Sequence, residues 1–114
     1  MLLDVTLGTN DLERGIRFYD AVMATLGFVR LQGGAAGWAG WGKDANSEYG
    51  LWLCPPFDGL PASVGNGTML TFAAASAAEV RAFHRVALHV QGHLAAGDLH
   101  TDQFFLCAVL CDLP

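Results

Sequence analysis

Cysteine and histidine are among the residue types that could hold a metal ion or act as nucleophile and base, and the chain has three cysteines and four histidines. Cys107 and Cys111 lie in one expected strand, where their spacing puts them on the same face. A zinc site would need two further ligands, and the nearby sequence supplies none. Together with Cys54 they make an odd number of cysteines without a CxxC spacing, so we expect reduced, mostly buried thiols rather than a disulfide framework.

The histidines are no better placed for catalysis. His84 and His89 fall on an expected helix, where we expect them at the surface. His93 and His100 fall in a poorly patterned segment, and they are the histidines that could reach a cavity as acid, base or ligand.

Two stretches of the chain share one plan. Asp4-Val-Thr-Leu leads into an expected helix at Asp11–Leu26, and Met69-Leu-Thr-Phe leads into another at Ala77–Val90. Each helix start has the spacing of a capping box, in Asn10 with Glu13 and in Ser76 with Glu79. The plan indicates a repeated strand, turn and capped helix, although coincidence is the alternative because this combination is common.

Alternation along the two strands divides their residues between two faces. Leu3, Val5 and Leu7 form the apolar face that the first helix would cover, so Asp4 and Thr6 face away from it. The same argument turns Met69 and Thr71 away from the second helix.

Further strands are expected at Phe28–Gln32, Tyr49–Cys54 and Phe104–Cys111. The glycine-rich segment Gly33–Gly42 between the first two is best explained by turns and close backbone packing, since nothing in it resembles a phosphate-binding loop. We expect one domain over residues 1–114, with one module at about 1–56 and a shorter one at about 66–114.

The composition of the 114 residues excludes several partners. A net charge of −5 without a cluster of Lys or Arg argues against nucleic acid. No run approaches the length of a membrane span and no signal peptide is visible, so we expect a cytoplasmic protein. A charged fraction of 15% against 53% hydrophobic residues predicts apolar surface buried in a homodimer.

Several motifs, in order, resemble one superfamily along nearly the whole chain. They are Val5-Thr-Leu-Gly-Thr-Asn-Asp-Leu-Glu-Arg, Arg17-Phe-Tyr-Asp, Leu26-Gly-Phe, Gly37-Trp-Ala-Gly-Trp-Gly, Leu51-Trp-Leu-Cys-Pro-Pro-Phe and Gly65-Asn-Gly-Thr. These motifs resemble those of small bacterial glyoxalase-like members of the vicinal oxygen chelate superfamily, which includes glyoxalases, bleomycin-resistance proteins and dioxygenases. The resemblance implies an α+β fold of two βαβββ-type modules, whose curved mixed sheet forms a trough with the helices outside. Here the second module would be truncated.

A divalent metal is the default cofactor of this superfamily, but the positions that would ligate it have changed. The usual histidines correspond to Asp4 and Met69, the acidic ligand of the third position corresponds to Trp52, and the strand of the last ligand is expected to be missing. One carboxylate does not provide the several O or N donors that such an ion needs. We therefore expect no metal, and the chain is not assigned as an enzyme or as a non-enzyme.

The resemblance implies a trough lined by Asp4, Thr6, Trp38, Trp41, Trp52, Met69, Thr71 and Phe105. We expect this trough to bind a small apolar or aromatic molecule, as in the drug-sequestering members. Individual residues keep simpler alternatives: Asp4 as a solvated residue, the tryptophans as core or dimer contacts, and Met69 as core filler.

Two other functions stay open. One is a metal-dependent lyase or dioxygenase with ligands from unexpected positions such as His93 or His100. The other is a remnant with little activity, whose open sheet edge is repaired by strand exchange in a dimer.

Overall fold

A computed structural model of the protein describes residues 2–31, 36–63, 69–92 and 105–110. Its elements are β1 (Val5–Gly8), α1 (Leu12–Ala24), β2 (Val29–Arg30), β3 (Ala39–Gly42), β4 (Leu51–Cys54), β5 (Met69–Ala74), α2 (Ala77–Gly92) and β6 (Phe105–Leu110). Helices and strands occur in both halves, and the expected α+β class is confirmed. Within the described residues, neither helix has the length and apolarity needed to cross a bilayer.

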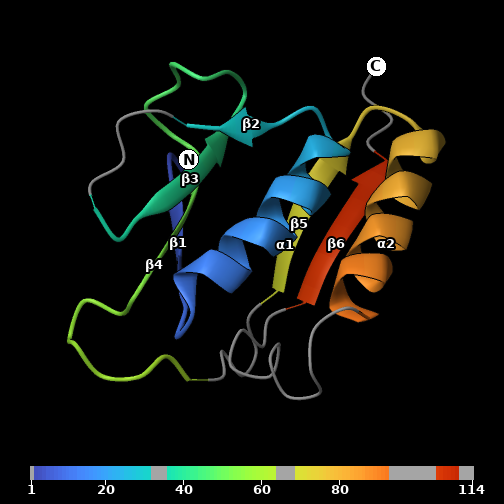
Figure 1. Ribbon diagram of the computed structural model, residues 1–114. Coiled ribbons are helices and arrows are strands. Elements are labelled where there is room, and N and C mark those ends of the chain that lie inside the picture. Colours follow the sequence, from blue (N-terminus) through green and yellow to red (C-terminus); the bar gives the residue numbers. More distant parts are fainter. Residues whose placement is uncertain (1, 32–35, 64–68, 93–104, 111–114) are drawn as a thin grey trace.

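The first half of the chain is a βαβββ module. Its four strands lie in the order β1-β4-β3-β2, with β1 parallel to β4 and the other pairs antiparallel, so the sheet is mixed. In the second half, β5 pairs in parallel with β6. Figure 1 shows α1 between the first sheet and the β5–β6 pair, and α1 also packs against α2. No strand ladder among the described residues joins the two sheets. Where we expected one curved sheet, the described strands therefore form two separate sheets.

The N-terminus of α1 is capped by Asp11, whose carboxylate accepts the backbone N–H of Arg14 at 3.2 Å. Our assignment of a capping box to Asn10 and Glu13 is therefore wrong. The Asn10 side chain is used elsewhere: it donates to the Ala62 carbonyl at 3.1 Å and accepts the Ala62 N–H at 2.7 Å.

A glycine with a positive φ follows the C-terminus of α1. Gly27 has a φ of 81°, and its N–H donates to the Ala24 carbonyl while that of Phe28 donates to the Met23 carbonyl. These two bonds have the pattern of a Schellman motif, in which a left-handed residue suits glycine.

The capping box of α2 is confirmed with one change. The Glu79 N–H donates to the Ser76 hydroxyl at 3.2 Å, and the Glu79 carboxylate accepts the N–H of Ala75 rather than that of Ser76. Phe83 of α2 is buried, and its ring centroid lies 6.2 Å from that of Phe72 in β5. The helix thus covers the apolar face of β5, as the alternation predicts.

The face of the first sheet that α1 covers forms the core. Leu7, Leu51 and Leu53 are buried there, and the close approach of Leu53 leaves no room for a side chain at Gly15 in α1. We expected the helix to cover Leu3 together with Val5 and Leu7, but β1 begins only at Val5 and Leu3 is 66% exposed. The core continues into the second half through Ala74 and Phe83.

Candidate functional site

The candidate site lies on the face of the first sheet that turns away from α1, which we call the outer face. Strand alternation and register place the following residues on it: Thr6, Gly8, Val29, Gly40, Gly42, Trp52 and Cys54. Glycines occupy much of this face, and Thr6 and Trp52 are register partners on neighbouring strands. Both glycines of β3 are buried, so this face offers a planar molecule one large aromatic ring rather than open backbone.

A carboxylate stands at one end of this face. Asp4 is exposed, and its Oδ1 accepts the N–H of Gly50 at 2.7 Å and the indole Nε1–H of Trp52 at 3.1 Å. The first bond fixes the carboxylate to the start of β4, and the second fixes the Trp52 ring. The described residues donate no hydrogen bond to Oδ2, so this oxygen can accept one from a ligand.

The Trp52 ring lies over Gly40 of the neighbouring strand β3, where there is no side chain. A Cβ at Gly40 would come within 2.5 Å of Cε3 and 2.7 Å of Cζ3 of Trp52, which real contacts do not allow. Trp38 stands beside the ring, with centroids 6.4 Å apart and planes at 69°. Trp38 is 45% exposed, so the two indoles form an accessible aromatic corner next to Asp4.

Trp41 is not part of this corner, and its assignment to the ligand surface is wrong. It is 1% exposed and faces α1, where its ring lies 5.4 Å from that of Tyr19. Its Nε1–H donates to Oδ1 of Asp20 at 2.9 Å. The residue is a core contact, which was the simpler of its two interpretations.

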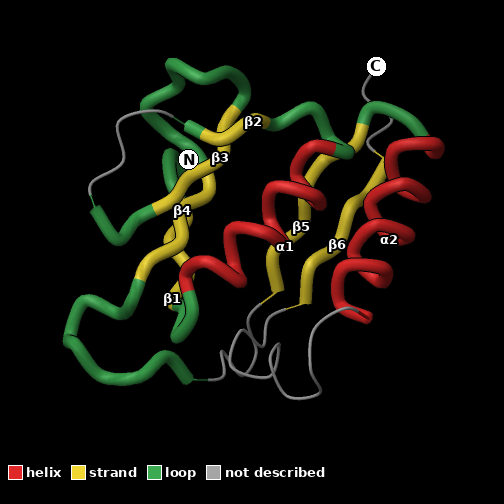
Figure 2. Tube along the Cα trace, in the orientation of Figure 1, coloured by secondary structure: helices red, strands yellow, loops and turns green. Residues whose placement is uncertain are grey.

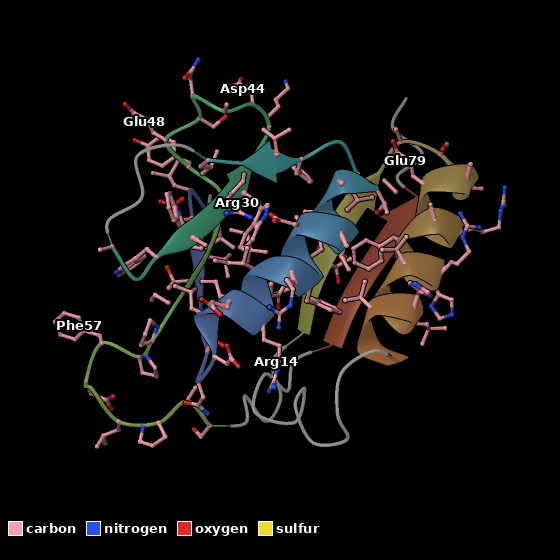
Figure 3. The ribbon with its side chains drawn as sticks, viewed as in Figure 1. Arg14, Arg30, Asp44, Glu48, Phe57 and Glu79 are labelled. Carbon is pink, nitrogen blue, oxygen red and sulfur yellow. The ribbon has the colours of Figure 1, made fainter. Side chains whose placement is uncertain are left out.

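Asp20 is a residue that sequence reasoning missed. It also pairs with the guanidinium of Arg30, which Figure 3 shows between β2 and α1. Burial raises the pKa of the Asp20 carboxyl, but hydrogen bonds from Arg30 and Trp41 outweigh it, and the pKa lies below its ordinary value. The pKa of Arg30 is raised, chiefly by its hydrogen bond to Asp20. This ion pair therefore belongs to the scaffold on the side opposite the candidate site.

The expected site residues of the second half lie on the other sheet. Thr71 is exposed on β5, as alternation predicts, and Met69 and Phe105 are backbone partners across the β5–β6 ladder. Of Met69 and Phe105 the structure describes the backbone alone. No hydrogen bond or ring contact within the described ranges links Thr71 with Asp4 or Trp52.

The loop after β4 covers one end of the outer face. A Cβ at Gly8 would lie 3.4 Å from Cγ of Pro56 and 3.5 Å from Cβ of Ala62. The two hydrogen bonds between Asn10 and Ala62 hold this loop in place, while Phe57 projects from it into solvent (Figure 3). The accessible part of the outer face is thus the end near Asp4, Trp52 and Trp38.

The described cysteine and histidines do not form a reactive centre. Cys54 is a free, buried thiol whose pKa is raised by burial, as expected of a structural cysteine. Over residues 2–31, 36–63, 69–92 and 105–110, no three His, Cys, Asp or Glu residues gather as a possible metal site. His93, His100 and Cys111 lie outside the described residues.

Comparison with known proteins rests on a structural match. No protein-family model matches the sequence, and no curated protein matches it significantly. A solved structure described as a glyoxalase/bleomycin resistance protein from Albidiferax ferrireducens matches with a TM-score of 0.77 and 28% identity, over 97% of this chain and 99% of that one. The chain belongs to the vicinal oxygen chelate superfamily.

Within the vicinal oxygen chelate superfamily, Asp4 and Trp52 take positions that the sequence resemblance assigns to metal ligands. Here they hydrogen-bond to each other instead. An indole N–H is a donor without a lone pair for a cation, so Trp52 cannot replace a ligating carboxylate. The described residues at these positions therefore do not fit a divalent ion.

Proposed function

We propose that this protein binds a small apolar or aromatic molecule on the outer face of its first sheet, without the divalent metal of its superfamily. The observation that carries the proposal is the hydrogen bond between Asp4 and Trp52 at two expected ligand positions. Where two metal ligands would be expected, this chain has a carboxylate that orients an aromatic ring. A surface that orients an indole suits a binder better than a Lewis-acid centre, which needs several converging donors.

The shape of the corner supports an aromatic ligand. Trp38 and Trp52 stand at 69° to each other, so a planar molecule against one ring can present its edge to the other. Thr6, exposed on the neighbouring strand, offers a hydroxyl to a polar substituent. Trp41 is removed from the proposed set, and Met69, Thr71 and Phe105 remain candidates from the second sheet.

Calorimetric titration tests the proposal directly, with naphthylmethanol as a neutral aromatic probe. We expect saturable binding, and we expect Trp52→Ala to weaken it about tenfold, in line with the energy of an aromatic contact and the area it buries. Leu88→Ala is the matched control, because Leu88 is an exposed apolar residue on α2. Equal affinities of wild type and Trp52→Ala would contradict the proposed site.

Elemental analysis of protein purified without added ions tests the absence of metal. Less than stoichiometric nickel, zinc, iron and manganese is expected. A stoichiometric ion would instead favour the lyase or dioxygenase alternative with ligands such as His93 or His100, and substituting each of these histidines would then identify the ligands.

We propose a homodimer as the working form. Leu2 and Leu3 are 81% and 66% exposed next to β1, and the described strands leave the far edge of β1 unpaired. Light scattering at micromolar concentration gives the mass, and a monomer would contradict this proposal. A cytoplasmic location stays an expectation from the sequence.

A further inference from the structure

We propose that the ligand of the outer face is an organic cation, namely an ammonium group carried on an aromatic body. The inference rests on the proposed function and adds the charge of the ligand to it. The ammonium would lie at Asp4 Oδ2 and against the Trp38 and Trp52 rings, with the aromatic body across the corner that these rings form.

The Asp4 carboxylate is already oriented for a cationic ligand. Its Oδ1 is held by two N–H donors, from Gly50 and Trp52, at 2.7 and 3.1 Å. These bonds fix the group in one orientation before any ligand arrives, so less side-chain freedom is lost on binding. Oδ2 accepts no hydrogen bond from the described residues, and an ammonium group is a donor that complements it.

The charge of the surrounding surface also favours a cation. Among the outer-face residues defined above, none carries a positive charge, and Asp4 beside them is an acid. The guanidinium of Arg30, on the adjacent strand β2, is paired with Asp20 toward α1. A carboxylate or phosphate on the ligand would meet Asp4, and the described residues of the outer face provide no cation to compensate it. The net charge of −5 of the whole chain adds a long-range attraction for cations.

The indoles of Trp38 and Trp52 provide a surface that binds cations. The face of a tryptophan ring is the aromatic surface to which a cation binds best, and two rings at 69° can surround one ammonium from two sides. The Trp52 ring is fixed by its bond to Asp4 and by its seat on Gly40. One carboxylate thus both orients a ring and provides the counter-charge beside it.

Three probes with one ring system separate charge from aromatic binding: naphthylmethylammonium, naphthylmethanol and naphthoate. We expect calorimetry at neutral pH and low salt to give a dissociation constant about tenfold lower for the ammonium than for the alcohol. Naphthoate should bind more weakly than the alcohol. High salt should reduce the advantage of the ammonium, since it depends on charge at an exposed site.

Asp4→Asn tests the role of the carboxylate, because its amide oxygen can still accept the two N–H bonds. The ratio of ammonium to alcohol affinity should fall to about one in this variant. Asp44→Asn is the matched control: it makes the same charge change in the turn after β3, where Asp44 accepts the Asn46 N–H and an amide oxygen can do the same. The control should keep the wild-type ratio.

The outcomes separate this inference from the proposed function. If all three probes bind wild type equally, or naphthoate binds best, the cation preference is wrong while the aromatic site stands. If no probe binds, both proposals are wrong. If Asp4→Asn fails to fold, the salt dependence in wild type decides, and an ammonium affinity that does not change with salt overturns the inference.

Discussion

Trp41, the largest fully buried side chain of the described sheet, donates its indole N–H to Asp20 of α1 at 2.9 Å. The Asp20 carboxylate therefore provides the acceptor that this buried N–H needs. Arg30 of β2 binds the same carboxylate from the solvent side. One acidic residue therefore joins the helix to two strands. Because the buried indole has a polar atom that must be paired, this contact determines more stability than its exposed ion pair.

Replacing Asp20 by Ala should lower the free energy of unfolding by about 1–3 kcal/mol, because it leaves the buried N–H of Trp41 without an acceptor. Asp20→Asn is the matched variant, since its amide oxygen keeps that acceptor while the charge and the bond that Oδ2 accepts from Arg30 are lost. Denaturant unfolding followed by tryptophan fluorescence measures both. Equal losses in the two variants would show that the indole bond contributes little.

The stability conferred by Asp20 should depend on pH in a defined direction. Despite burial, which raises it, the pKa of the folded carboxyl lies below its ordinary value of 3.8 because of the bonds from Arg30 and Trp41. The contribution is thus complete well above 3.8 and is lost as the pH falls through the folded pKa. Wild type should lose stability more steeply than Asp20→Asn in acid titrations of unfolding, and parallel curves would contradict this.

Gly40→Ala should displace the Trp52 ring. The added Cβ would overlap the ring at 2.5–2.8 Å, and overpacking of this kind costs about 1–3 kcal/mol. Near-ultraviolet circular dichroism should report the altered indole environment, and affinity for naphthylmethanol should fall with it. Gly8→Ala is the control on the same face, where the nearest atom would be 3.4 Å away. Similar spectra for both variants would argue against the close approach of Trp52.

Asn10→Ala should loosen the loop after β4. The variant removes both side-chain bonds to Ala62, at 3.1 and 2.7 Å, with an expected cost of about 1–2 kcal/mol. Limited proteolysis should then cleave at or near Phe57 faster than in wild type. Asn46→Ala is the control, since Asn46 bonds to Asp44 through its backbone N–H alone among the described contacts. Unchanged cleavage in Asn10→Ala would mean that other contacts hold the loop.

Regular alternation made much of the fold predictable. Thr6 and Thr71 are exposed on strands whose neighbouring positions are apolar, so their faces could be assigned from sequence. Trp41 could not be assigned in this way, because all four residues of β3 are buried and two of them are glycines. Without a polar position in the strand, no pattern tells which face the tryptophan takes.

Long-range contacts explain the remaining differences. Asn10 and Asp11 are both good capping residues, and the choice depends on Ala62, a residue distant in the chain that binds the first of them. The close packing at Gly40 was expected in kind, but its partner Trp52 follows from the β3–β4 register. Such a register is set by tertiary packing, which a single sequence does not display.

The parallel pairing of β1 with β4 has a consequence during protein synthesis. Translation proceeds from the N-terminus, so β1 and α1 leave the ribosome before the strand that completes their sheet, which ends at Cys54. Until then the apolar stripe of α1, including Phe18 and Val22, has no sheet to cover it. The nascent chain should therefore present this helix to chaperones, and it should become resistant to protease only once translation has passed β4.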